Sequence, residues 1–126
     1  MIKVPIYSGL FFFTIFVKKS MFFSFIVPVY NRPDEIDELL ESLTRFTSSI
    51  PFEVVIVEDG STIPCENIIE KYTPKLTISY YFKSNSGPGD SRNYGMTLAK
   101  GDYYIILDSD CIIPPNYLSQ VQHSLE

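Results

Sequence analysis

Two carboxylates stand close together near the end of the chain, in the run Asp108-Ser109-Asp110. They directly follow an apolar run, Tyr103 to Leu107, which is typical of a buried strand. Acidic side chains at positions i and i+2 after a strand can share a hard divalent cation with a diphosphate, because Mg²⁺ and Mn²⁺ prefer oxygen ligands. A solvated loop of acidic turn residues would explain the same run, so both interpretations stay open when it is taken alone.

A second acidic run, Glu58-Asp59-Gly60-Ser61, follows another apolar run, Glu53 to Val57. Carboxylates at a strand end accept hydrogen bonds from sugar hydroxyls in dinucleotide-binding folds, and a ring N–H of a base can donate in the same way. Asp, Gly and Ser are also common in ordinary turns, and this alternative has equal weight for the run alone.

The run from Asn85 to Asn93 (NSGPGDSRN) is typical of a Gly/Pro loop that leads into a helix. Asp90 or Ser91 is expected to cap this helix, and Arg92 in its first turn could meet a phosphate or a ring oxygen. The run lacks the GK[ST] ending of a P-loop. A capped surface helix with an exposed arginine is the alternative.

The other reactive residue types indicate no further site. His123 is the only histidine and lies near the end of the chain, so no Ser-His-Asp arrangement can be built on it. Cys65 and Cys111 form no CxxC pattern, which argues against a zinc site or a disulfide framework and favours reduced thiols.

Strands and helices are expected to alternate along the chain and to position these polar runs. The first helix should begin after Asn31 as its cap, with Pro33 in its first turn, and Gly101 should end the third. The patterns predict strands over Phe23–Val29, Glu53–Val57, Thr77–Lys83 and Tyr103–Leu107, and helices over Pro33–Thr47, Ile63–Tyr72, from Asp90 or Ser91 to Lys100, and from Pro114-Pro115 to the end.

This alternation predicts an α/β fold, a Rossmann-like parallel sheet with helices on both faces. The common order 3-2-1-4 places the first strand between the second and the fourth. The carboxyl ends of the strands then meet at one edge, where ligands bind. Three polar segments should come together there: Pro28 to Arg32, Glu58 to Ser61 and Asp108 to Asp110.

Composition and charge limit the classes of ligand. The 126 residues have room for one domain of ordinary size, and 45% are hydrophobic, enough for a packed core. The net charge of -5 argues against a nucleic-acid partner, which requires a basic surface. An acidic protein that binds an anionic ligand needs a divalent cation or a helix N-terminus at the site.

Residues 1–20 form an apolar extension outside the alternating pattern. Its apolar stretch, Val4 to Val17, is shorter than the ~20 residues that a membrane span needs. Three interpretations remain open: an extension upstream of a true start at Met21, a membrane-associated segment, or a secretory signal. We expect a cytoplasmic protein, with peripheral association at the inner face of the membrane as a variant of this expectation.

The three polar segments in their order carry a resemblance to a known family. The runs FIVPVYNRP, VVIVEDGS and NSGPGDSRNYGMTLAKGDYYIILDSD resemble the family 2 glycosyltransferases of the A-type fold, over Phe23 to about Leu125. The resemblance implies that residues 21–126 are the nucleotide-sugar-binding part of such an enzyme. It also implies a nucleotide-diphospho-sugar donor, usually a uridine one, and inverting transfer of a hexosyl group to the hydroxyl of a saccharide or lipid-linked acceptor.

The resemblance also implies roles for single residues. Pro28, Tyr30 and Asn31 would line the nucleotide. Asp59, with Glu58 beside it, would contact the base, and Arg92 would lie over the nucleotide. Asp108 would reach the ribose or the metal, and Asp110 would be the principal ligand of Mn²⁺ or Mg²⁺. The full expected donor site comprises Pro28, Tyr30, Asn31, Glu58, Asp59, Asn85, Gly87, Arg92, Asp108 and Ser109, and the metal site comprises Asp108 and Asp110.

Two features depart from the family pattern. Cys111 stands where the family often has a further acid, but the metal pair is complete. The family's catalytic base lies well beyond this motif, so we expect a truncated fold whose base lies beyond Glu126. A non-catalytic nucleotide-binding module is the first alternative. A phosphatase of the haloacid dehalogenase type is the second, although that family places its DxD after the first strand and here the motif ends the fourth.

Overall fold

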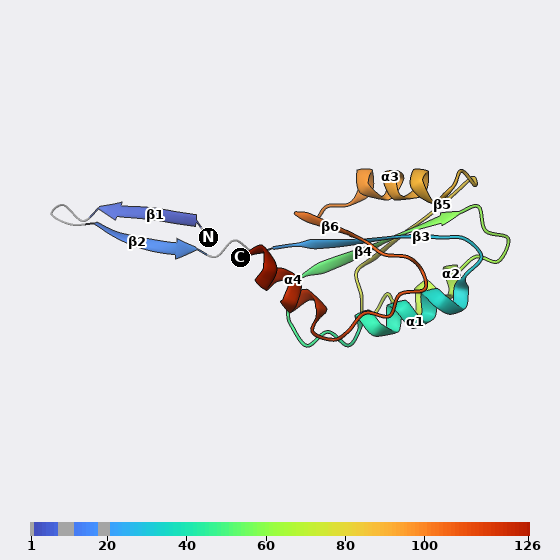
Figure 1. The fold of residues 1–126 in the computed structure, drawn as a ribbon, viewed down its shortest axis with the longest axis horizontal. Coiled ribbons are helices and arrows are strands. Elements are labelled where there is room, and N and C mark those ends of the chain that lie inside the picture. Colours follow the sequence, from blue (N-terminus) through green and yellow to red (C-terminus); the bar gives the residue numbers. More distant parts are fainter. Residues whose placement is uncertain (1, 8–11, 18–20) are drawn as a thin grey trace.

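The computed structural model describes residues 2–7, 12–17 and 21–126 of the chain, and side chains from Met21 onward (Figure 1). The elements are, in chain order, β1 (Ile2–Tyr7), β2 (Phe12–Val17), β3 (Phe23–Val29), α1 (Pro33–Leu43), β4 (Phe52–Asp59), α2 (Glu66–Tyr72), β5 (Ile78–Lys83), α3 (Pro88–Leu98), β6 (Tyr103–Ile106) and α4 (Tyr117–Leu125).

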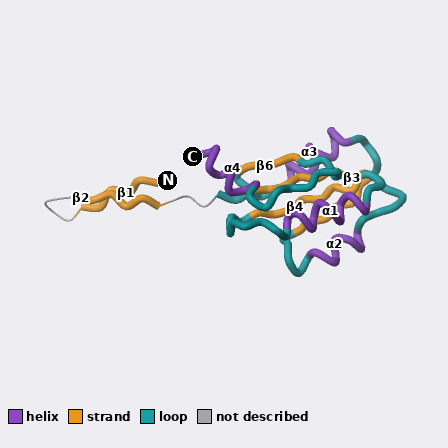
Figure 2. Tube along the Cα trace, turned by 60° about the horizontal axis from the view of Figure 1, so that its bottom comes forward, coloured by secondary structure: helices purple, strands orange, loops and turns teal. Residues whose placement is uncertain are grey.

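The main sheet has four strands in the order β5-β4-β3-β6. All three strand pairs are parallel. The predicted order, with the first strand of the domain between the second and the fourth, is confirmed. Helix α3 lies on one face of the sheet, and α1 and α2 lie on the other (Figures 1 and 2). The predicted α/β architecture with helices on both faces is therefore confirmed.

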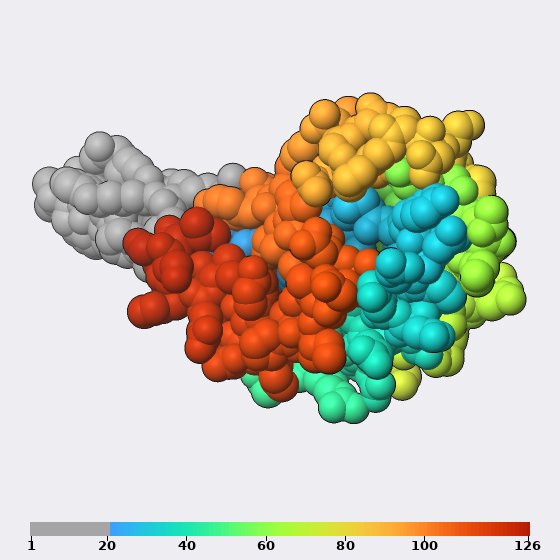
Figure 3. Space-filling model, turned by 45° about the vertical axis from the view of Figure 1, so that its right-hand side comes forward, coloured from blue at the N-terminus to red at the C-terminus, as the bar shows by residue number. Residues whose placement is uncertain are grey.

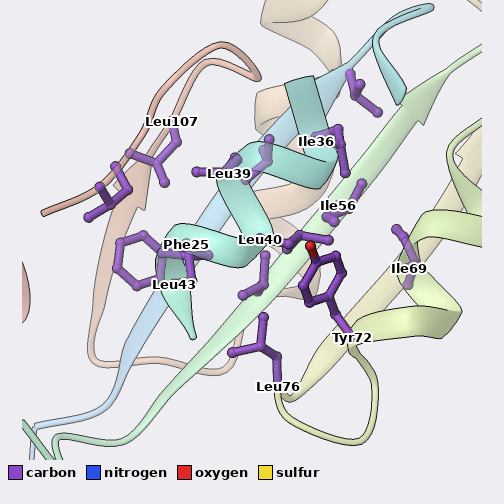
Figure 4. Close-up of a cluster of buried hydrophobic side chains, with 14 of the residues drawn as sticks. Phe25, Ile36, Leu39, Leu40, Leu43, Ile56, Ile69, Tyr72, Leu76 and Leu107 are labelled. Carbon is purple, nitrogen blue, oxygen red and sulfur yellow. The ribbon is translucent and has the colours of Figure 1, made fainter. Parts of the chain in front are cut away.

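Successive residues of each strand pack into different layers, because side chains alternate between the two faces of a sheet. Phe25 of β3 and Ile56 of β4 belong to the larger core, under α1 and α2 (Figure 4). Ile26 and Val57 belong to a smaller core that Met96 and Leu98 of α3 cover. This alternation decides which side of the sheet each residue at a strand end faces.

Helix α1 ends at Leu43 rather than at the predicted Thr47. The Ser42 and Thr44 hydroxyls donate hydrogen bonds to the carbonyls of Leu39 and Glu41, at 2.6 Å each, and so compete with the helical pattern at this end. Phe46 was expected to extend the apolar stripe of the helix. It instead reaches the core from the turn that follows, with its ring 5.2 Å from that of Phe52.

Boundaries of four other predicted elements also differ from the structure. Strand β4 runs on through Glu58 and Asp59, so these two acids are strand residues rather than part of a turn. Helix α3 begins at Pro88, because proline suits the first helical turn and Gly87 before it has a φ of 98°. Helices α2 and α4 begin at Glu66 and Tyr117, later than predicted.

Strands β1 and β2 form a separate, antiparallel two-stranded sheet. The sequence pattern did not predict strands there. Among the described residues, no helix has both the length and the apolar character needed to cross a membrane.

Candidate functional site

A pocket of about 280 Å³ lies at the carboxyl ends of β3 and β4, where the loop before α3 meets them. It brings together five of the ten residues predicted for the donor site. Its lining consists of Pro28, Val29, Tyr30, Asp59, Asn85, Gly87 and Pro88. The predicted residues Asn31, Glu58, Arg92, Asp108, Ser109 and Asp110 do not line it.

The two acids at the end of β4 face opposite sides of the sheet. Asp59 has the same parity as Val57 and points to the α3 side, as does Pro28 on β3. Glu58 has the parity of Ile56 and points into the larger core, where it is fully buried. No part of the Glu58 side chain is exposed in this structure, so Glu58 does not line the pocket beside Asp59.

Glu58 instead connects the turn after β4, the start of α2 and strand β5. Its carboxylate accepts hydrogen bonds from the Ser61 hydroxyl at 2.6 Å, the Cys65 amide at 2.7 Å and the Tyr80 hydroxyl at 2.8 Å. Burial and the neighbouring Glu58 carboxylate raise the pKa values of the Cys65 thiol and the Tyr80 hydroxyl, so both groups stay protonated. Cys65 is accordingly a buried, unreactive thiol.

Asp59 is 4% exposed and holds the loop that closes the pocket. Its carboxylate accepts hydrogen bonds from the Ser86 amide at 2.8 Å and the Gly87 amide at 3.0 Å, and it pairs with the Lys83 ammonium at 2.9 Å. Burial favours the neutral form of Asp59. These three donors outweigh burial and keep the pKa of the carboxyl below its ordinary value, so Asp59 is ionised.

The same loop lies directly on the turn after β4. The Asn85 side-chain amide donates a hydrogen bond to the Asp59 carbonyl at 2.9 Å. Gly60 has a φ of 68°, and a Cβ at this position would lie 2.6 Å from the Asn85 nitrogen. Glycine is therefore required at position 60 both for its backbone conformation and for this close approach.

Asn31 connects the ends of β3 and β4, and the structure assigns the N-cap of α1 to Arg32 instead. The Asn31 side-chain oxygen accepts hydrogen bonds from the Thr62 and Ile63 backbone amides at 2.8 and 2.9 Å. The backbone amide of Asn31 donates to the Ser61 hydroxyl at 2.8 Å. Its φ of 53° is in the left-handed region, which asparagine tolerates better than most residues. The predicted capping role is wrong, because the side chain is used between loops.

The pair Asp108 and Asp110 follows the strand next to β3. The Leu107 amide still donates to the Ile26 carbonyl at 2.9 Å, and Leu107 packs in the larger core. Both carboxylates are exposed and have no hydrogen bond or ion pair within the described part of the chain. Ser109 is tied back to α1, since its hydroxyl donates to Glu35 at 2.9 Å.

The Asp108–Asp110 pair fits a cation that is shared with a ligand rather than one enclosed by the protein. Among the described residues, no group of three or more His, Cys, Asp or Glu side chains could hold a metal by itself. Two free carboxylates supply oxygen ligands, which suit Mg²⁺ or Mn²⁺, and the oxygens of a diphosphate could complete the coordination.

Arg92 is in the first half of α3 and is half-buried. In residues 21–126 its guanidinium forms no hydrogen bond or ion pair, so it is available for an anion. Another hollow, about 420 Å³ between α1 and Ile112 to Pro115, contains none of the predicted site residues.

Two contributors to the site were not predicted from the sequence. The sequence predicts Lys83 only as the end of a strand. Because this strand ends at the same edge of the sheet as β4, a contact between Lys83 and Asp59 could have been expected. Ser61 was noted as a turn residue, whereas its hydroxyl joins Glu58 to Asn31. No short sequence pattern identifies the second contact, because it joins residues from two loops.

Proteins of known function are similar to this chain in sequence and in fold. The chain is 42% identical over 93 residues to the poly(ribitol-phosphate) beta-N-acetylglucosaminyltransferase TarS of Staphylococcus aureus. That match covers 71% of this chain, which spans only 16% of the relative's length.

Two solved structures have the same fold. The crystal structure of S. aureus TarS 1–349 in complex with UDP-GlcNAc matches with a TM-score of 0.77 and 40% identity, over 82% of this chain and 30% of that one. A mannosyltransferase from Pyrobaculum calidifontis in complex with GDP-Man and Mn²⁺ matches with a TM-score of 0.69 and 25% identity, over 77% of this chain and 30% of that one.

A family model also matches most of the chain. The model described as Glycosyl transferase family 2 matches residues 24–126, which include the main sheet except Phe23 at the start of β3, and the pocket at the strand ends. The chain belongs to glycosyl transferase family 2.

Proposed function

We propose that this chain supplies the donor-binding part of a metal-assisted glycosyltransferase that uses a uridine-diphosphate sugar. The acceptor would be a hydroxyl of a saccharide or a lipid-linked molecule. A cytoplasmic location, at or near the inner face of the membrane, is part of the proposal. It is supported by the two free cysteines, which favour a reducing compartment.

One observation carries the proposal. The pocket at the ends of β3 and β4 has an ionised acceptor, Asp59, in its wall and an exposed aromatic ring, Tyr30, beside it. The free carboxylates of Asp108 and Asp110 follow the neighbouring strand β6. A base that donates an N–H and a diphosphate that needs a cation are the two ends of one ligand, a nucleoside diphosphate. The UDP-GlcNAc complex of the TarS relative supports uridine as the nucleoside.

The residues of the chain then have distinct roles. Asp59 accepts the N–H of the base, and Tyr30 offers its ring as a stacking surface. Asp108 and Asp110 hold the cation, and Arg92 adds positive charge near the phosphates. The bound cation would stabilise the negative charge that develops on the leaving nucleoside diphosphate. Deprotonation of the acceptor hydroxyl also requires a base, and none of these residues is given that role.

The test is calorimetry of UDP binding with and without Mn²⁺. Asp110→Ala should lose about 2 kcal/mol or more of the Mn²⁺-dependent binding free energy, because a charge-assisted ligand is removed. Glu70→Ala, which removes an exposed carboxylate from α2, is the matched control and should bind as the unaltered chain does. Binding that is unchanged and independent of metal in Asp110→Ala would contradict the proposal.

A further inference from the structure

Lys83 is a largely enclosed cation beside the pocket to which the proposed function gives no role. It is the last residue of β5 and is the register partner of Asp59 on β4. Its side chain is 16% exposed, and that of Asp59 is 5% exposed. Few lysines are buried to this extent unless they are paired, so its contacts require an explanation.

Each hydrogen bond that the Lys83 ammonium donates goes to Asp59 or to the loop that closes the pocket. The ammonium donates to an Asp59 carboxylate oxygen and to the Ser84 carbonyl, at 2.9 Å each, and also to the Ser86 hydroxyl. The Asp90 carboxylate lies 3.7 Å away. The Ser86 hydroxyl donates to Asp90 at 2.5 Å, so the cluster extends from β4 to the first turn of α3. Lys83 is the only cation of this cluster in the described chain.

The cluster leaves Asp59 one free place for a ligand. A carboxylate has about four acceptor positions, two on each oxygen. Lys83 and the Ser86 amide use both positions on Oδ1, while the Gly87 amide uses one on Oδ2. One position on Oδ2 remains, in a side chain that lines the pocket. An ionised Asp59 can therefore accept one N–H from a ligand and can donate nothing.

We propose that Lys83 is a positioning residue that holds the Ser84–Gly87 loop against β4 and keeps Asp59 an acceptor, so that the pocket selects a base with a ring N–H. The selected class is uridine nucleotides over cytidine nucleotides, since uracil has an N–H at ring position 3 and cytosine has an unprotonated nitrogen there. This rests on the proposed function, because it assumes that a nucleotide base occupies the pocket.

The charges around Asp59 give this role a pH signature. The charged and titratable groups around it are the Lys83 ammonium from β5, which pairs with it, the Asp90 carboxylate from α3, which lies 3.7 Å from that ammonium, and Tyr30 after β3, which lines the same pocket. Without Lys83, burial still favours a protonated Asp59 while the hydrogen bond and the positive charge that oppose it are lost, so the pKa of this carboxyl rises. Protonation converts the free acceptor into a donor, which opposes uracil and favours cytosine.

The experiment measures UDP and CDP affinity for Lys83→Met, Lys83→Arg and the control Lys75→Met, an exposed lysine in the loop before β5. Each variant is compared with the unaltered chain at the same pH, so that titration of the phosphates cancels. For Lys83→Met, UDP affinity relative to the unaltered chain should fall about tenfold at about pH 5 and about threefold at about pH 8. The UDP preference over CDP should shrink as the pH falls. Lys83→Arg should restore most of the preference, and Lys75→Met should change neither.

Several outcomes would overturn the inference. One is an equal loss of UDP and CDP affinity at every pH in Lys83→Met, which would indicate a purely structural role. Unchanged UDP affinity in Lys83→Met would also overturn the inference. If Lys83→Met does not fold, carbon-13 NMR of the unaltered chain with UDP bound provides the test, and titration of the Asp59 carboxyl at or above its ordinary pKa would refute the role of Lys83. Absence of UDP binding by the unaltered chain, or equal UDP and CDP affinity in both the unaltered chain and Asp59→Asn, would instead contradict the proposed function.

Discussion

Two adjacent acids, Glu58 and Asp59, have different roles because a strand turns neighbouring side chains to opposite faces. Asp59 lies in the pocket wall with one acceptor position free, whereas Glu58 is buried among Ser61, Cys65 and Tyr80. Through Ser61, Glu58 also supports the backbone of Asn31. At the scale of single residues, the site is therefore a surface of few ligand-facing groups that rests on a buried hydrogen-bond network.

Glu58→Gln should destabilise the fold by about 1–3 kcal/mol, because an amide cannot accept all three hydrogen bonds and places an NH₂ group among donors. Urea unfolding followed by circular dichroism measures this. Glu70→Gln, an exposed position on α2, should stay within about 0.5 kcal/mol of the unaltered chain. Equal stability of the two variants would mean that the Glu58 network contributes little to folding.

Helix α3 positions the loop that closes the pocket, and a close contact with the sheet sets its distance. A Cβ at Gly95 would lie 2.6 Å from Ile26 Cγ2 and 3.3 Å from Val57 Cγ2. The helix backbone therefore rests directly on β3 and β4. Since Gly87 and Pro88 at its start line the pocket, a displaced α3 would also change the pocket.

Gly95→Ala should accordingly destabilise the chain by about 1–3 kcal/mol through overpacking, and it should also weaken UDP binding. Gly89→Ala is the matched control in the same helix, because a Cβ there meets nothing within 4 Å. That change should leave stability within about 0.5 kcal/mol. Thermal unfolding and calorimetry of both variants check the pair, and a Gly95→Ala chain as stable as Gly89→Ala would contradict the close contact.

The segment after β6 positions the two free carboxylates by lying along α1 (Figure 3). Ser109 is tied to Glu35, the Ile113 amide donates to the Ser42 hydroxyl at 3.0 Å, and the Thr47 amide donates to the Pro115 carbonyl at 3.0 Å. Leu107, Ile113 and Leu118 pack into the larger core below these contacts. The position of the Asp108–Asp110 pair thus depends on α1 as well as on β6.

At the scale of the whole molecule, the four-stranded sheet and its helices should fold without residues 1–20. Strands β1 and β2 pair in a sheet separate from the main one, and all core residues whose side chains the structure describes lie at Met21 or later. A chain that starts at Met21 should keep its melting temperature and be more soluble, because it lacks a Phe-rich apolar stretch. Loss of cooperative unfolding in the shortened chain would show that the first residues contribute to the core.

The 126-residue chain should bind its donor without transferring sugar to an acceptor. Glu58 is buried, Asp59 and Asp90 are engaged with Lys83 and the pocket loop, and Asp108 and Asp110 are assigned to the cation. None of these five carboxylates is then left as a general base, and loss of such a base alone costs ~10²–10⁴-fold in rate.

Incubation of the chain with UDP-sugars, Mn²⁺ and a panel of saccharide acceptors, followed by mass spectrometry of the products, tests this. Nucleotide release without a glycosylated product is the expected result, since water can still attack a bound donor slowly. Product that depends on an acceptor and exceeds the level from Asp110→Ala would mean that these residues include a base.

The sequence by itself determined the architecture and the location of the site. Apolar runs that alternate with amphipathic stretches sufficed for the parallel sheet and its order, because periodicity and right-handed crossovers leave few arrangements. Since parallel strands end at one edge, the polar runs after β3, β4 and β6 had to lie near one another. Pro28, Tyr30, Asp59, Asn85 and Gly87 line one pocket for this reason.

Only the tertiary structure decided which of these residues line the pocket. Strand β4 continues through Asp59, and the alternation of side chains along it buries Glu58. A predicted strand that ends at Val57 does not assign either acid to a face of the sheet. The Asn31 side chain accepts hydrogen bonds from the loop after β4 instead of capping α1. The register of β5 with β4 places Lys83 beside Asp59. These roles depend on hydrogen bonds between residues far apart in the chain, which local sequence patterns do not specify.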